Sequence, residues 1–105
     1  MKNDLLINLK GYQYVQKDEN SMGCYLYAEY VDKVFDTIIG EQIIQNYMEI
    51  YKQIENKIIE DLSLDEVVAY CTFIRRGERF CDGHIAKFID NGFLVKLYER
   101  YLELN

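Results

Sequence analysis

The strongest constraint on the fold is the spacing of the apolar residues that follow residue 30. Two successive stretches, 31–39 and 43–59, place apolar side chains at i, i+3, i+4 and i+7, which is the spacing of one face of an α-helix. The sequence contains no proline that would interrupt either stretch. We therefore predict two amphipathic helices, the first ending at Gly40 and the second continuous over 43–59.

A third helix is marked by the residues at its start. Ser63-Leu64-Asp65-Glu66 has the form of a capping box, with Ser63 as the N-cap and Glu66 at the third helical position. Leu62 is placed to pack against Val67 across this cap, and Gly77 is expected to end the helix. The residues expected on its buried face are Leu64, Val67, Val68, Cys71 and Ile74.

Tyrosine is concentrated in the N-terminal part of the chain. Segments 12–16 and 24–30 are rich in tyrosine and other residues that favour strands, and the polar segment 17–23 between them contains turn-forming residues. This pattern predicts an antiparallel β-hairpin over 12–30. A short helix is expected before it, within the first eleven residues.

Two further helices complete the prediction. One begins near Asp82 and ends at Asn91-Gly92, and the last runs on to residue 102. The predicted fold class is α+β, mainly α, with an N-terminal hairpin attached to a helical part over 31–104. A chain of this length predicts a single domain, 1–105.

The charge and cysteine content exclude several functional classes. The net charge is −6, of which segment 31–62 carries −4, so we expect neither general nucleic-acid binding nor attraction to an anionic membrane. No apolar run is long enough for a signal peptide or a membrane span. Cys24, Cys71 and Cys81 form an odd set without C-x-x-C spacing, which favours a reduced, cytoplasmic protein.

Charged residues are densest between Arg75 and His84. This segment holds three arginines, two carboxylates, a thiol and the only histidine of the chain. Its sequence, Phe-Ile-Arg-Arg-Gly-Glu-Arg-Phe-Cys-Asp-Gly at 73–83, together with Asn91-Gly92 and Leu-Tyr-Glu-Arg-Tyr-Leu at 97–102, resembles the C-terminal signature of the DUF6508 family. The resemblance covers 63–104 and implies a small bacterial or phage-encoded protein of unknown function, without implying an activity.

One interpretation of this segment is structural. Gly77 and Gly83 permit backbone conformations that other residues avoid, Phe80 would fill the core between two helices, and Asp82 would cap the helix that follows. Arg75 or Arg79 would then form bridges to Glu78, to Asp82 or to the carbonyl groups at the end of the preceding helix. The structural signature is accordingly Glu78, Phe80, Asp82 and Gly83.

A second interpretation is functional. Arg75, Arg76 and Arg79 place three guanidinium groups within five positions, which suits a phosphate, a carboxylate or an acidic segment of a partner protein. Arg79 and His84 also have the R-x4-H spacing of HEPN-type ribonucleases, in which the histidine moves a proton and the arginine stabilises the phosphate. That spacing defines the alternative hypothesis of a small ribonuclease or another phosphate-handling enzyme.

Neither a metal nor a cofactor is expected. Cys81 and His84 are separated by two residues, but further ligands would have to come from Cys24, Cys71 or a carboxylate, whereas structural zinc sites usually contain two close pairs. Cys71 lies on the apolar face of its predicted helix and is expected in the core.

The hairpin tyrosines are candidates for a binding surface. Tyr12 and Tyr14 share one face of the first predicted strand, and Tyr25 and Tyr27 share one face of the second. Tyrosine is enriched in protein interfaces, although ordinary cross-strand pairing explains these residues equally well. We therefore expect a small non-enzymatic protein that serves as an interaction or regulatory module of a bacterium or mobile element. Its partner would be a protein of unknown identity, and a homodimer is compatible with the same surface.

Overall fold

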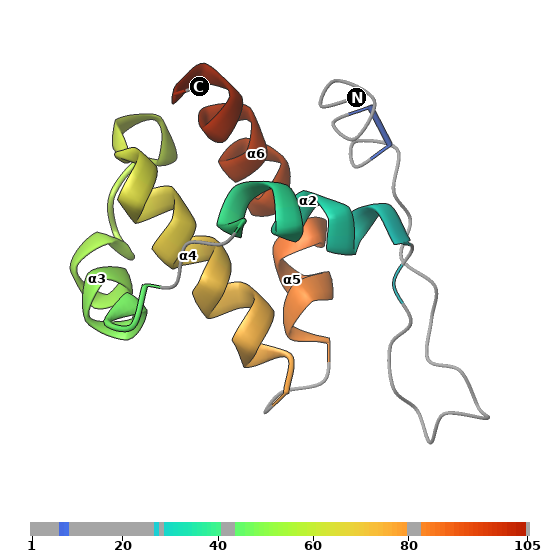
Figure 1. Cartoon of the computed structure of the whole chain (residues 1–105), viewed down its shortest axis with the longest axis horizontal. Coiled ribbons are helices and arrows are strands. Elements are labelled where there is room, and N and C mark those ends of the chain that lie inside the picture. Colours follow the sequence, from blue (N-terminus) through green and yellow to red (C-terminus); the bar gives the residue numbers. More distant parts are fainter. Residues whose placement is uncertain (1–6, 9–26, 28, 41–43, 80–82, 105) are drawn as a thin grey trace.

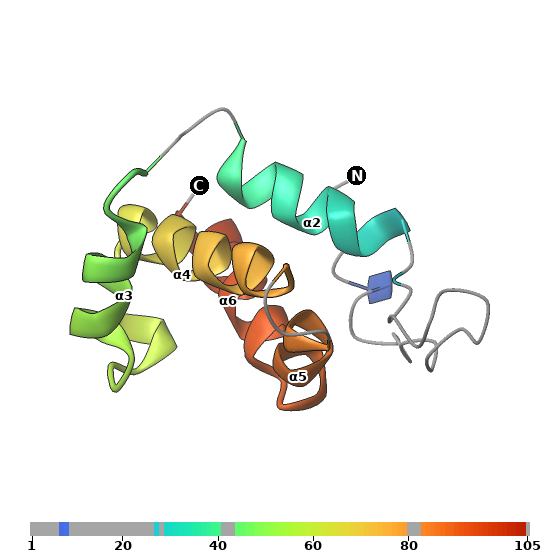
Figure 2. The ribbon, with the colours of Figure 1, turned by 90° about the horizontal axis from the view of Figure 1, so that it is seen from below.

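Helix α4 (Leu64–Gly77) is the helix around which the others pack. The computed structural model describes residues 7–8, 27, 29–40, 44–79 and 83–104. In Figure 1, α4 lies between α3 and α5 and below α6, and the turned view in Figure 2 shows α2 and α5 on opposite sides of it. The four helices that contact α4 are α2 (Glu29–Ile39), α3 (Tyr47–Ile54), α5 (His84–Asp90) and α6 (Phe93–Leu104).

The core is built on several faces of α4. Val67, Val68, Cys71 and Ile74 are buried as the apolar stripe predicts, and Tyr70 on another face of the helix is buried as well. A helix that has neighbours on several sides must be apolar over more than one stripe. The other helices supply their own buried residues to this core: Val31, Val34, Phe35, Ile38, Ile54, Ile85, Phe88, Ile89, Leu94, Leu97 and Tyr98.

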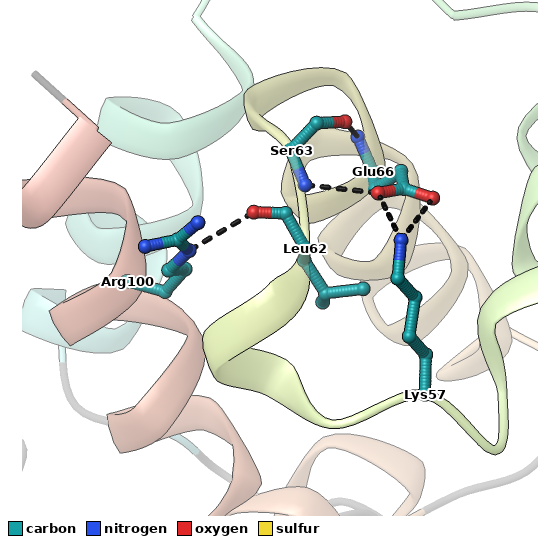
Figure 3. Close-up of polar contacts among 5 residues, drawn as sticks. All are labelled: Lys57, Leu62, Ser63, Glu66 and Arg100. Carbon is teal, nitrogen blue, oxygen red and sulfur yellow. Dashed lines mark hydrogen bonds and ion pairs between the residues drawn. The ribbon is translucent and has the colours of Figure 1, made fainter.

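The start of α4 confirms the predicted capping box. The Ser63 side chain accepts a hydrogen bond from the backbone N–H of Glu66 at 3.3 Å, and the Glu66 carboxylate accepts one from the backbone N–H of Ser63 at 2.9 Å. Figure 3 shows that Lys57 also reaches this carboxylate, with 3.1 Å between Nζ and Oε1. The Nε–H of Arg100 on α6 donates to the carbonyl oxygen of Leu62 at 2.9 Å, which ties the segment before α4 to α6.

The predicted fold class, α+β with an N-terminal hairpin, is wrong. Every regular element in the described ranges is helical, and none of those residues forms a strand. Glu29 and Tyr30, which the prediction assigned to the second strand of the hairpin, are the first residues of α2. The acidic residues Glu29 and Asp32 suit the positive end of a helix, and burial of Val31 and Val34 rewards helical spacing. Strand preference of tyrosine depends on its packing surroundings and does not outweigh that burial. The rest of the predicted hairpin, 12–26 and 28, lies outside the described residues.

The helix predicted over 43–59 is shorter than expected. Helix α3 spans Tyr47–Ile54, Ile58 has extended backbone angles and an exposed side chain, and a 3₁₀ turn, η2, follows at Ile59–Asp61. The bend after α3 allows Ile54, Ile59 and Leu62 to be buried together, and η2 contacts α6. The apolar spacing alone does not reveal this bend, because Ile58 continues the stripe although its side chain lies in solvent.

Glycines stand at the ends of the helices, as predicted for Gly40, Gly77 and Gly92. Gly40 after α2 and Gly92 between α5 and α6 have φ values of 56° and 80°, in the left-handed region that glycine tolerates best. Gly77 is the last residue of α4, without a positive φ, and α5 begins at His84, with Gly83 at φ 87° as its N-cap, close to the predicted start. None of the helices in the described ranges combines the length and apolar character that crossing a bilayer requires.

Candidate functional site

The Glu78 carboxylate holds together the joint between α4 and α5. One oxygen accepts a hydrogen bond from the backbone N–H of Gly83 at 2.9 Å, and the other accepts from the N–H of Ile85 at 2.8 Å. The Tyr27 hydroxyl donates to the same carboxylate at 3.0 Å and accepts from the N–H of Ala86 at 3.1 Å. The first N–H groups of α5 are thus satisfied by side chains from outside that helix. This arrangement supports the structural role of Glu78.

His84 is held within the same joint. Its Nδ1 lies 3.0 Å from the carbonyl oxygen of Ile74, and because a carbonyl can only accept, Nδ1 carries the proton of this hydrogen bond. The ring contacts Phe73 and Phe88 edge to face, with centroid separations of 5.3 and 5.1 Å. The imidazole also lies against the backbone of Gly77, where a Cβ atom would come within 2.2 Å of Nδ1.

The three arginines lie in different surroundings. Arg75 forms an ion pair with Asp36 of α2 at 2.9 Å, a partner that the sequence analysis did not propose, and Asp82, one of the proposed partners, lies outside the described residues. Arg76 places its guanidinium over the ring of Tyr47, 5.2 Å from the centroid. Arg79 is exposed in the turn after α4. In the part of the chain that the structure describes, neither Arg76 nor Arg79 has a side-chain hydrogen bond or ion pair.

These arginines border a cleft between α2, α4 and the start of α5. Its volume is about 610 Å³, within the range of typical ligand sites. We name it the arginine cleft. The described residues that line it are Tyr27, Asp32, Ile39, Ile44, Thr72, Arg75, Arg76, Glu78, Arg79 and Ile85.

The chemistry of the arginine cleft is mixed. Isoleucines from three segments form its apolar part, and the three arginines form its cationic part. Of its two carboxylates, Glu78 is engaged with the N–H groups of α5, whereas Asp32 is exposed. A site of this kind binds an anionic group next to an apolar one through charge-assisted hydrogen bonds and burial.

Comparison with protein families identifies the chain. The model of a family of unknown function, DUF6508, matches residues 2–105. The chain belongs to DUF6508. The match confirms the resemblance seen over 63–104 and extends it over nearly the whole sequence. The searches of curated proteins and of solved structures gave no significant match.

In this DUF6508 chain, the predicted site residues fall into three groups. Arg75, Arg76, Arg79, Tyr27 and Glu78 all line the arginine cleft. His84 is not among its described lining residues, and the R-x4-H interval spans the turn between two helices. Gly83 is the N-cap of α5, and the remaining candidates lie outside the described residues: Tyr12, Tyr14, Tyr25, Phe80, Cys81 and Asp82.

Sequence reasoning missed the rest of the cleft in this DUF6508 member. Asp36, the partner of Arg75, lies 39 positions earlier in the chain, and no local pattern indicates that pairing. The apolar lining residues Ile39, Ile44 and Ile85 each belong to an apolar stripe, but the stripe does not indicate that Ile39 and Ile44 would stay partly exposed whereas Ile85 is buried.

Metal-binding residues do not assemble in the described part of the DUF6508 chain, which contains no group of three or more His, Cys, Asp or Glu side chains able to hold an ion. Cys71 is fully buried, and this burial raises the pKa of its thiol far above the ordinary value. The thiol therefore belongs to the core, as the apolar stripe predicts.

Proposed function

We propose that this DUF6508 member is a non-enzymatic interaction module of a bacterium or mobile element, and that it binds a protein partner in the arginine cleft. The observation that carries the proposal is the presence of Arg76 and Arg79, without internal acceptors among the described residues, on a cleft with apolar lining. Arginine is enriched at protein interfaces, where its planar group forms several directed hydrogen bonds.

The alternative ribonuclease hypothesis has less support from the geometry. Arg79 borders the cleft, whereas the Nδ1–H of His84 is directed to the carbonyl oxygen of Ile74 and its ring packs between Phe73 and Phe88. A nucleic-acid substrate would also meet a protein of net charge −6.

The test is affinity purification from host cells with three forms of the chain. The cleft variant is Arg76→Glu/Arg79→Glu, and the matched control, Lys52→Glu/Lys96→Glu, makes the same change in net charge at exposed residues of α3 and α6. We expect a specific protein to be recovered with the wild type and the control and lost with the cleft variant. Recovery with all three forms contradicts the proposal. Thermal unfolding followed by circular dichroism verifies that both variants are folded.

A further inference from the structure

We infer that the arginine cleft selects a peptide segment of its partner in which an acidic side chain stands beside an aliphatic one. This inference rests on the proposed function and names the chemistry of the partner. It follows from how the charges and the apolar side chains are distributed within the cleft.

The three arginines of the cleft differ in whether an internal partner already neutralises them. Arg75 is paired with Asp36 at 2.9 Å, and its guanidinium lies 5.9 Å from the centre of the Phe35 ring, so it is already neutralised and positioned. Arg76 rests on the ring of Tyr47, which restrains the guanidinium plane while its N–H groups stay exposed. Arg76 and Arg79 are therefore the two groups available to a carboxylate.

The apolar surface of the cleft would not be covered by an anion alone. Ile39 and Ile44 are only half-buried, and they face a cleft whose third isoleucine, Ile85, comes from α5. A small inorganic anion would leave this surface in contact with water. An aliphatic side chain from the partner would cover it, and each Å² of apolar surface removed from water favours binding.

The charge balance of the lining favours a singly charged group over a doubly charged one. The described lining holds three arginines and two carboxylates, Asp32 and Glu78, and Asp36 already neutralises Arg75, so the charges of these six side chains balance. A phosphate dianion would give up more hydration than an aspartate or glutamate side chain on entering the cleft, and this balanced lining supplies no net positive charge to offset that cost. The complementary ligand is therefore a carboxylate with an adjoining aliphatic group.

The experiment is selection of a displayed random-peptide library on the wild-type protein, with the variants Arg76→Glu/Arg79→Glu and Lys52→Glu/Lys96→Glu as comparisons. We expect the enriched peptides to place Asp or Glu within a few positions of Leu, Ile or Val. These peptides should bind the cleft variant at least roughly tenfold more weakly than the wild type, and the control variant unchanged.

A second measurement separates peptide from phosphate. In an NMR titration, an enriched peptide should shift both the arginine Nε–H signals and the methyl signals of Ile39, Ile44 and Ile85. The affinity of inorganic phosphate should be about tenfold lower than that of the peptide, or too low to measure. Phosphate binding as strong as the peptide, enriched peptides without acidic residues, or no enrichment over the cleft variant would each overturn the inference.

The two proposals can fail separately. If a protein partner is lost with the cleft variant while the enriched peptides lack acidic residues, the interaction role stands and the assigned ligand chemistry is wrong. If the partner is recovered equally with all three forms, the cleft is not its binding site and both proposals fail.

Discussion

Glu78 connects three parts of the chain through one carboxylate. It follows the last residue of α4, accepts hydrogen bonds from the N–H groups of Gly83 and Ile85 at the start of α5, and contacts the Tyr27 hydroxyl ahead of α2. Gly83 occupies the N-cap position of α5 and has no side chain with which to cap it. The carboxylate therefore substitutes for the missing local cap.

Replacing this carboxylate should loosen the joint. We expect Glu78→Ala to lower the free energy of unfolding by about 1–3 kcal/mol, because the partly buried N–H groups of Gly83 and Ile85 lose their acceptor. Tyr27→Phe should cost less, and the double variant should cost less than the sum of the two. Urea unfolding measures all three, with Glu49→Ala on the exposed face of α3 as the control. Additive effects of Glu78 and Tyr27 would contradict the coupling.

Gly77 and His84 form a second pair in the same joint. Replacing a glycine within a helix by alanine ordinarily raises the free energy of unfolding by up to about 1 kcal/mol. Here the added Cβ atom would collide with the Nδ1 atom of His84, so we expect Gly77→Ala to lower the free energy of unfolding by about 1–3 kcal/mol instead. The test is to repeat the substitution in a His84→Ala background, where the loss should disappear. An equal loss in both backgrounds would exclude the imidazole as its cause.

Helix α4 shows how an element is stabilised at both ends and on several faces. Its N-terminus is satisfied by the capping box, and its middle is covered by four neighbouring helices. Its C-terminal turn carries Arg75 and Arg76, where cations interact favourably with the helix dipole. The same helix thus forms the centre of the core and one wall of the arginine cleft.

The capping box predicts a specific response to acid. The backbone N–H of Ser63 holds the pKa of Glu66 below its ordinary value of 4.5, with further help from Lys57, although partial burial opposes the shift. A lowered pKa in the folded state means that the ionised Glu66 stabilises the fold above pH 4.5, and that this contribution is lost as the pH falls through the lowered value.

Glu66→Gln tests that response. The wild type should be more stable than the variant at about pH 7, and the difference should shrink at about pH 3, because a protonated glutamate and a glutamine are both neutral. Chemical denaturation at the two pH values measures the difference. Glu49→Gln, on the exposed face of α3, serves as the control for the removal of a surface charge. A difference in stability between the wild type and Glu66→Gln that is the same at both pH values would contradict the lowered pKa of Glu66.

The distribution of charge over the molecule explains why a cationic cleft can exist on an acidic protein. Segment 31–62 carries −4 of the net charge of −6, and one of its carboxylates, Asp36, neutralises Arg75. The other two arginines keep their charge at the cleft. We therefore expect the overall field to discourage general binding to nucleic acid, while Arg76 and Arg79 remain available to the proposed anionic group.

The core can be monitored through Cys71, whose thiol is fully buried and has a raised pKa. In a Cys24→Ser/Cys81→Ser background, we expect a thiol reagent to modify Cys71 only as fast as the protein unfolds, since both access and ionisation require opening. The rate should rise steeply with urea and match the unfolding rate seen by circular dichroism. Rapid modification without denaturant would contradict the packing described above.

The candidate site was partly predictable from sequence. The cluster of arginines at 75–79 and the carboxylate of Glu78 stand out in the printed chain, and the structure places them on one cleft. The pairing of Arg75 with Asp36, and the isoleucines that complete the cleft, depend on how α2 packs against α4. Contacts between distant segments leave no local pattern, so the sequence did not indicate Asp36 as the partner of Arg75.

The features that depend on residues close together in the chain could be predicted from the sequence. These are the helical stripes, the Ser63–Glu66 capping box, the glycine at the end of α2 and the family signature. The features that depend on long-range packing could not be predicted in this way. Tyr30 is helical and α3 ends at Ile54 because these choices bury apolar side chains against neighbours far away in the sequence. Local preferences are worth only a fraction of the burial energy of a core residue, so the tertiary structure decides wherever the two conflict.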